Sequence, residues 1–242
     1  MRGLLDAALA DPWRTLDTLL DEPLHPGGEA ATERLLDRAD VDADTRLLEV
    51  GCGAGDALSL ACDRGADAAG IDPDPTLGSV TAPTIRGDAT ALPVRDDAVD
   101  VVLAECVLCL TDLPAALAEC RRVLRDGGRL AVSDVVVEGE APVVPDGVAD
   151  ALCLTGARSR DDLAAALDGA GFAVRSMDDH YDDLVAMRDR VQGRVDYESL
   201  LGLLGERGAR SLTAIEDLEA AVDDGRIGYV SVVARAESPS GR

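Results

Sequence analysis

The sequence predicts an α/β fold, in which a parallel sheet carries helices on both faces. Short apolar segments alternate with longer segments whose apolar residues recur at helical spacing, and a glycine-rich turn directly follows the first apolar segment. Strands that alternate with helices imply a parallel sheet that is buried on both faces. A chain of 242 residues is long enough for one such domain with a substantial core.

The chain begins with a helical pattern that precedes the predicted sheet. Residues 6–39 have helical periodicity, but the prolines and glycines of residues 22–28 stop a helix and form a loop. We therefore expect two helices in an N-terminal segment, residues 1–44, followed by the core in residues 45–176. The strands predicted in this core are residues 46–50, 68–71, 84–86, 100–104, 129–134 and 172–176, and the helices are residues 56–64, 114–124 and 161–170.

A helical insertion is expected before the last strand. Residues 178–225 are acidic and carry apolar residues at helical spacing, and this stretch is too long for a hairpin loop. We assign residues 177–226 to the insertion and residues 227–236 to the last strand of the core. Residues 237–242 have the composition of a disordered tail.

The charge of the chain restricts its partners. The net charge is −24, there is no lysine and no asparagine, and the isoelectric point is about 4.2. Such a surface is typical of adaptation to high salt, where screening weakens repulsion between like charges. Nucleic acids and anionic membranes bind basic patches, so we expect neither as a partner. Because the sequence has no secretory signal and no membrane-spanning apolar run, we expect its six cysteines to lie in a reducing cytoplasm.

The strongest motif is a glycine-rich turn between the first predicted strand and the helix after it. It contains Gly51, Cys52, Gly53 and Gly55, and Glu49 precedes it. A dinucleotide site requires the spacing G-x-G-x-x-G, whereas this turn has G-x-G-x-G. An acid beside the turn suits the sulfonium and ammonium groups of S-adenosylmethionine (SAM) better than a pyrophosphate. The turn therefore favours SAM, although a plain tight turn remains the alternative.

Two further acids follow the next two predicted strands. Asp72, with Pro73 after it, ends the second strand about 20 residues beyond the turn, where a carboxylate can accept hydrogen bonds from both ribose hydroxyls. Asp88 and Ala89 follow the third strand, and an aspartate there can accept a hydrogen bond from the adenine amine. In so acidic a chain, the alternative is that both are ordinary solvated acids.

These segments resemble the successive core motifs of class I SAM-dependent methyltransferases. The resemblance covers about residues 45–135 and rests on LLEVGCGAG, GIDPDP, GDATALPVRDDAVDVVLAE and RVLRDGGRLAVSD. It implies a Rossmann-like sheet of seven strands, the last antiparallel, with SAM at the carboxyl ends of the first strands. Glu105, at the end of the fourth strand, is a further candidate for cofactor binding.

The candidate catalytic residues are three cysteines. Cys106 and Cys109 follow the fourth strand at the edge where parallel sheets bind ligands, and Cys153 lies after the fifth strand. The segments ECVLCL and LCLTGA resemble motifs of arsenite methyltransferases, in which two cysteines hold trivalent arsenic. Cys106 and Cys153 match these cysteines. The sequence departs from the family pattern because no cysteine precedes Cys52 and because Glu105 replaces an asparagine; Cys109 is our candidate for the third sulfur.

Thiolates select soft centres, and arsenic held by three sulfurs keeps a lone pair that can attack a methyl group without a general base. The favoured acceptor is therefore a thiol-bound metalloid such as arsenite. Three alternatives remain: methylation of a small organic molecule with the cysteines as packing residues, a non-catalytic protein that binds SAM or metal, and a structural zinc held by the three cysteines and His180. His180 could also act as a base or lie on the surface, and His25 could line the cofactor mouth. Cys62, Cys120, Trp13 and Phe172 are expected in the core.

Overall fold

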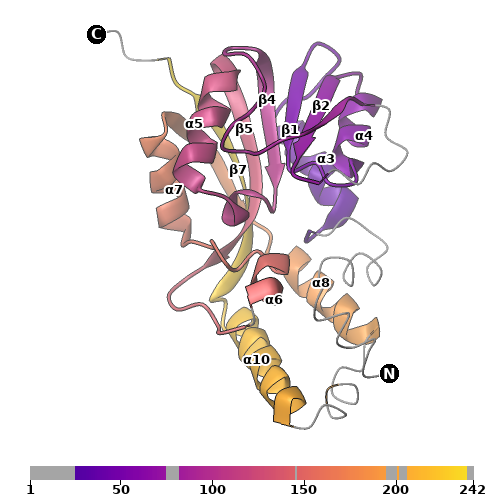
Figure 1. Cartoon of the computed structure of the whole chain (residues 1–242), viewed down its shortest axis with the longest axis vertical. Helices are drawn as coiled ribbons and strands as arrows, with labels where there is room; N and C mark the ends of the chain where they lie inside the picture. The colour runs from indigo at the N-terminus through magenta and orange to yellow at the C-terminus, as the bar shows by residue number, and fades with distance from the viewer. Residues whose placement is uncertain (1–24, 75–81, 145, 195–200, 202–205, 239–242) are drawn as a thin grey trace.

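The computed structural model describes residues 25–74, 82–144, 146–194, 201 and 206–238. A seven-stranded sheet has the order β3-β2-β1-β4-β5-β7-β6 (Figure 1). β7 (Ile227–Ala236) runs antiparallel to both of its neighbours, β5 (Leu124–Val137) and β6 (Phe172–Asp179), and the other pairs are parallel. The remaining strands are β1 (Arg46–Val50), β2 (Asp67–Asp72), β3 (Thr84–Arg86) and β4 (Val99–Glu105). This confirms the predicted α/β fold and the antiparallel last strand.

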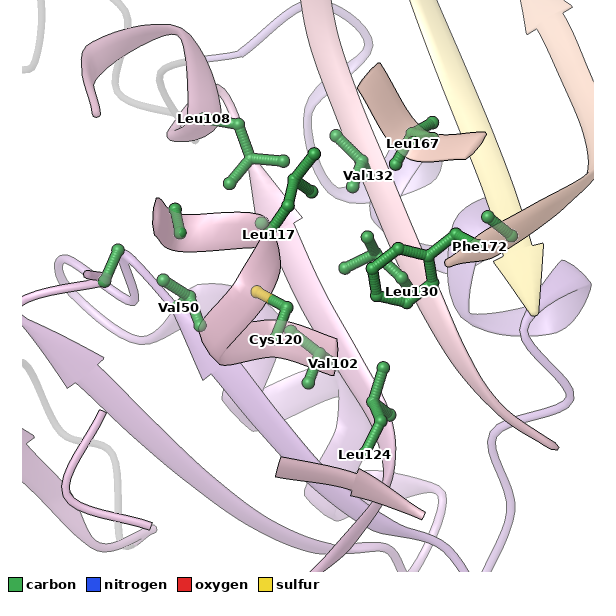
Figure 2. Packing of buried hydrophobic residues seen from close by; sticks show 14 of the residues in the cluster. Val50, Val102, Leu108, Leu117, Cys120, Leu124, Leu130, Val132, Leu167 and Phe172 are labelled. Atoms are coloured by element: carbon green, nitrogen blue, oxygen red, sulfur yellow. The ribbon is translucent and has the colours of Figure 1, made fainter. Parts of the chain in front are cut away.

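Helices cover both faces of the sheet, as the sequence predicts. α3 (Gly28–Arg38) and α4 (Asp56–Asp63) contribute to one apolar cluster, whereas α5 (Leu113–Val123) and α7 (Arg160–Gly169) contribute to another on the opposite face. Successive residues of a strand therefore point to different clusters; in β4, Val101 and Leu103 join the first and Val102 joins the second. Figure 2 shows the second cluster, where Phe172 and Cys120 are buried as expected.

Three helices lie together beyond the carboxyl edge of the sheet in Figure 1. They are α6 (Asp146–Ala151), α8 (Tyr181–Arg194) and α10 (Glu206–Asp223). In the sequence, α8 and α10 come between β6 and β7, where the helical insertion was expected. α6 was not predicted. None of the helices within the described ranges is long and apolar enough to cross a membrane.

Several predicted boundaries differ from the structure. β6 continues through residues 177–179, which pair with β7, so the insertion begins later than predicted. β5 is longer at both ends than residues 129–134 because its far end pairs with β7 up to Val137. Of the two expected N-terminal helices, α3 is described; the earlier one, with Trp13, lies outside the described residues, as do residues 239–242 of the predicted tail.

Candidate functional site

The turn after β1 requires its glycines. Gly51, Gly53 and Gly55 have φ values of +77°, +46° and +86°, a region in which residues with a Cβ are strained. At Gly51 a Cβ would also lie 2.2 Å from the side chain of Val107. Gly55 is the N-cap of α4, so the turn presents backbone N–H groups at the start of a helix.

Asp72 ties the end of β2 to this turn. The backbone N–H of Gly53 donates to Asp72 Oδ2 at 3.0 Å, and the N–H of Asp74 donates to Oδ1 at 2.7 Å. The carboxylate is half-buried and Pro73 beside it is exposed. Each carboxylate oxygen can accept a further hydrogen bond, so Asp72 can still receive the hydroxyls of a ligand.

Glu49 is a buried acid with an unused acceptor. It is 5% exposed, and its Oε2 has no hydrogen-bond partner among the described residues. Burial, together with the negative charges of Glu105 and Asp56, raises the pKa of Glu49 well above its usual value. A cationic ligand beside this carboxyl would offset the cost of burying it.

The other predicted cofactor residues divide between surface and core. Asp88 is exposed, and its Oδ1 accepts hydrogen bonds from the N–H and the hydroxyl of Thr90, which lower the pKa of Asp88; Ala89 is buried. The Cys52 side chain packs into the core where a Cβ on Gly70 would lie 2.6 Å from its sulfur. Burial raises the pKa of Cys52 to about 12, so its thiol is a packing group beneath the turn.

The turn, the unpaired Glu49 oxygen and the Asp72 carboxylate fit the chemistry of SAM. Its ammonium and sulfonium groups are cations and its ribose hydroxyls are donors, which matches a set of carboxylate acceptors around a glycine turn. A Cβ added at Gly53 would meet no atom within 4 Å. The backbone is therefore open to a ligand at this point.

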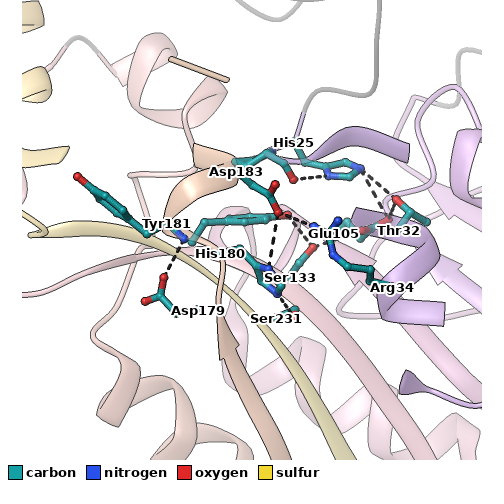
Figure 3. Close-up of polar contacts among 12 residues, drawn as sticks. His25, Thr32, Arg34, Glu105, Ser133, Asp179, His180, Tyr181, Asp183 and Ser231 are labelled. Atoms are coloured by element: carbon teal, nitrogen blue, oxygen red, sulfur yellow. Dashed lines mark hydrogen bonds and ion pairs between the residues drawn. The ribbon is translucent and has the colours of Figure 1, made fainter. Parts of the chain in front are cut away.

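Glu105 faces α3 and β5. Thr32 Oγ1 donates to Glu105 Oε2 at 3.0 Å, and Ser133 Oγ donates to Oε1 at 3.4 Å. His25 Nε2 lies 3.9 Å from Oε2 and 3.3 Å from Thr32 Oγ1 (Figure 3). Both oxygens of Glu105 therefore have protein partners, and Thr32 and Ser133 are buried participants that the sequence analysis missed.

The three candidate catalytic cysteines are brought together. Cys106, Cys109 and Cys153 are 9%, 4% and 3% exposed and belong to one apolar cluster. The neighbouring thiols of Cys106 and Cys109, together with burial, raise the pKa of Cys153. Its sulfur also lies 3.5 Å from the carbonyl oxygen of Cys106. We call this group the thiol cluster.

Two of these cysteines have an unusual backbone conformation. Cys106 and Cys153 have φ values of +55° and +58°. This left-handed region costs a non-glycine residue about 1–3 kcal/mol, and such strain is concentrated at functional sites. Between Cys106 and α5 the chain forms a short 3-10 helix over Leu108–Leu110.

Gly156 allows the segment containing Cys153 to approach Cys109. A Cβ on Gly156 would lie 2.0 Å from the carbonyl oxygen of Cys109, closer than any packing permits. The loop after α6 can therefore contact the segment after β4 only because residue 156 has no side chain. This explains in physical terms why a glycine follows Cys153 at this spacing.

Asp134 completes the cluster and was missed by sequence reasoning. Its Oδ2 accepts the N–H of Cys109 at 3.0 Å and its Oδ1 accepts the N–H of Val135 at 2.9 Å. Ligand atoms of Cys106, Asp134 and Cys153 lie within 4.8 Å of one another. Burial raises the pKa of Asp134 to about 6. The available signal was the polar pair Ser133 and Asp134, which interrupts the apolar run of residues 130–137.

Asp134 also affects the neighbouring thiol. The hydrogen bond with Cys153 acts to lower the pKa of Cys109, but burial and the charge of Asp134 outweigh it and raise this pKa to about 11. The uncomplexed cysteine is therefore a thiol near neutral pH. Tyr229, fully buried, lies with its hydroxyl 4.0 Å from the Cys106 sulfur.

The zinc site that includes His180 is wrong. His180 Nε2 lies 2.6 Å from Ser231 Oγ and Nδ1 lies 3.7 Å from Asp183 (Figure 3). Among the described residues, the group that could hold a metal ion consists of Cys106, Cys153 and Asp134, and His180 is not part of it. Burial and the nearby Arg34 lower the pKa of His180. Of the other cysteines expected in the core, Cys62 is only half-buried.

The sheet order and the glycine turn with its acids are those of Rossmann-like, SAM-dependent methyltransferases. A methyltransferase domain family matches residues 48–132. Methyltransferase GfsG from Streptomyces halstedii is 34% identical over 235 residues, which cover 88% of this chain and 82% of that protein. The chain belongs to the methyltransferase family, and its cofactor is SAM.

Two further comparisons bear on the acceptor and on the fold. An arsenite methyltransferase from Halobacterium salinarum is 35% identical over 145 residues, covering 52% of this chain and 37% of that protein. The structure of geranyl diphosphate methyltransferase in complex with SAM superposes with a TM-score of 0.69 at 17% identity, covering 86% of this chain and 85% of that one. At this identity the superposition shows the fold alone.

Proposed function

We propose that this enzyme methylates a small acceptor held by the thiol cluster, and that the favoured acceptor is trivalent arsenic such as arsenite. The observation that carries this proposal is the meeting of three buried thiols at the carboxyl edge of the sheet. The cofactor residues in this proposal are Glu49, Gly51, Cys52, Gly53, Gly55, Asp72, Pro73, Asp88 and Ala89, with Glu105 supporting the site through α3 and β5.

The cofactor turn is in contact with the segment that carries Cys106 and Cys109. Gly51 lies against the side chain of Val107, the residue after Cys106. A ligand on the turn and a metalloid on the thiols would therefore be neighbours, which is the positioning that a methyl displacement needs. SAM supplies an electrophilic methyl group on a sulfonium.

The raised pKa values of the thiols are compatible with this chemistry. When a thiol replaces a hydroxide on arsenous acid, the S–H bond breaks, an S–As bond forms, and the proton leaves with the hydroxide as water. Cys109 therefore needs no stable thiolate before it binds, although its pKa is about 11. The bound arsenic keeps its lone pair, so the methyl transfer requires no protein base.

Backbone strain supports a role for the sulfur atoms. A cysteine that serves only as packing gains nothing from a left-handed backbone, and glycine would adopt it at lower cost. Cys106 and Cys153 both have this conformation, and their sulfurs lie within 4.8 Å of one another. The match to the arsenite methyltransferase adds support, although this chain spans only about a third of that protein.

A second candidate function is methylation of a small organic molecule. It is favoured by the match to methyltransferase GfsG, which extends over 82% of that protein. The thiols would then be part of the apolar cluster and would not touch the acceptor. This alternative predicts that activity survives the loss of the sulfurs.

The test is transfer of label from SAM in molar KCl, comparing trivalent arsenic plus glutathione with pooled organic acceptors. We expect label on arsenic, with Cys106→Ser and Cys153→Ser reducing the rate by at least about a hundredfold. Cys62→Ser, a half-buried cysteine outside the cluster, is the matched control and should retain the rate. Labelling of an organic acceptor that persists in both serine variants would replace arsenic with the second candidate.

A further inference from the structure

The thiol cluster contains one group that trivalent arsenic does not use. Asp134 is 4% exposed, and one of its oxygens lies within 4.8 Å of the sulfurs of Cys106 and Cys153. The charge of Arg158 acts on Asp134, but no described cationic side chain forms an ion pair with it. Arsenic bound by three sulfurs keeps one lone pair, which has to face the methyl group of SAM. A carboxylate has no bond to make with that lone pair, so Asp134 is not an arsenic ligand.

We infer that Cys106, Cys153 and Asp134, joined by Cys109 from the segment after β4, form a site that binds one thiophilic divalent cation, such as Zn²⁺, in competition with the methyl acceptor. On binding, S–H bonds break, S–Zn bonds form and the protons leave to solvent, with no change of oxidation state. The competition rests on the function proposed above, whereas the cation site itself does not.

The donor set suits such a cation. Zn²⁺ prefers four ligands in a tetrahedron and accepts thiolate sulfur and carboxylate oxygen together. With Zn–S near 2.3 Å and Zn–O near 2.1 Å, the ligand atoms would stand about 3.5–3.8 Å apart. The ligand atoms of Cys106, Asp134 and Cys153 already lie within 4.8 Å of one another. Contraction by about 1 Å, through side-chain rotation, would bring these three atoms to the spacing of zinc ligands, and rotation of the Cys109 side chain would supply the fourth ligand.

The carboxylate of Asp134 is held in place before any cation binds. Each of its oxygens accepts one backbone N–H, from Val135 and from Cys109. Each oxygen keeps a second lone pair that can coordinate a metal. Hydrogen bonds that orient a ligating carboxylate strengthen metal binding, and a cation would offset the burial of this negative charge.

Zinc binding can be measured on the purified full chain by competition with a chromophoric chelator, and the ligands identified from the thiolate absorption of the Co²⁺ form. We expect one ion per chain and thiolate-to-cobalt bands. Asp134→Asn should weaken Zn²⁺ binding at least about tenfold and leave arsenite affinity within about twofold. Asp126→Asn, at an exposed acid far from the thiols, is the matched control.

The inference is wrong if the wild-type chain binds no zinc, or if Asp134→Asn binds it as tightly as wild type. If Asp134→Asn does not fold, wild-type protein still gives an answer: one equivalent of Zn²⁺ should prevent arsenite binding, and simultaneous binding of both would overturn the shared site. Zinc binding without arsenite binding would leave this site intact and refute only the proposed acceptor.

Discussion

The candidate site has two parts, the glycine turn with its acids (the cofactor part) and the three cysteines with Asp134 (the thiol part). Both contain residues with a left-handed backbone, but the residue types at these positions differ. In the cofactor part, the left-handed positions are glycines, Gly51, Gly53 and Gly55, which adopt it with little strain. In the thiol part, the left-handed positions are Cys106 and Cys153, which have a Cβ and are strained. Within the candidate site, glycine therefore stands where the turn needs only its backbone, and we infer that the strained positions keep cysteine because its side chain is needed.

The two parts also differ in polarity and in assembly. Asp72 and Asp88 are at least partly open to solvent and lie at the ends of neighbouring strands. The thiols and Asp134 are buried, and they come from the segments after β4, within β5 and after α6. Loss of one cofactor acid should therefore affect binding of SAM alone, whereas loss of a cysteine in the buried part should affect both stability and the binding of arsenic.

The largest expected effect is the pH dependence caused by Asp134. Its pKa is raised from 3.8 to about 6 in the folded protein, so the folded state favours the protonated acid. The protonated Asp134 therefore stabilises the folded state. This stabilisation is fully present below pH 3.8 and is lost as the pH rises through about 6, which lowers the free energy of unfolding by roughly 3 kcal/mol. Urea unfolding of metal-free protein in molar KCl should show this loss.

The control is Asp134→Asn. This variant loses one acceptor for a backbone N–H, a loss that does not depend on pH, and its amide does not ionise. The difference in unfolding free energy between wild type and variant should therefore shrink as the pH rises from 4.5 to 7. If the unfolding free energies of wild type and variant run parallel over this pH range, Asp134 is not protonated in the folded state at pH 4.5.

The cofactor part was largely predictable because its determinants are local in sequence. The positions of Gly51 and Gly55 and the acid at Asp72 follow from a strand, a turn and a helix in succession, and the structure has this order. β7 could be placed antiparallel only through the family resemblance, because apolar periodicity does not give strand direction.

The thiol part was predictable only in its cysteines. Asp134 reaches them because β5 places a polar side chain beneath the segment after β4, and no sequence spacing reveals that contact. Glu105 was expected to bind the cofactor, but Thr32, 73 residues away in the chain, occupies one of its oxygens. The contact between Gly156 and Cys109 likewise depends on how the loops pack.

Asp72→Ala tests whether the cofactor part acts independently. The variant loses the carboxylate that holds the Gly53 N–H and would receive the ribose, and we expect SAM affinity to fall about thirtyfold, or about 2 kcal/mol. Calorimetry in concentrated KCl measures this, and arsenite affinity should be unchanged. Asp74→Ala, an exposed acid two residues on, is the matched control. Equal losses of both ligands would show that the two parts are coupled.

Gly156→Ala is the smallest of these perturbations and tests the assembly of the thiol part. Its Cβ would lie 2.0 Å from the carbonyl oxygen of Cys109, so the two segments must separate. We expect trivalent arsenic to bind about tenfold more weakly, a cost of about 1.4 kcal/mol, with SAM affinity unchanged. Gly169→Ala, in α7, adds a Cβ that meets no atom within 4 Å and should leave both affinities unchanged. Wild-type arsenic affinity in Gly156→Ala would mean that the close approach to Cys109 does not position the Cys153 sulfur, and the thiols would then have to be reconsidered as packing.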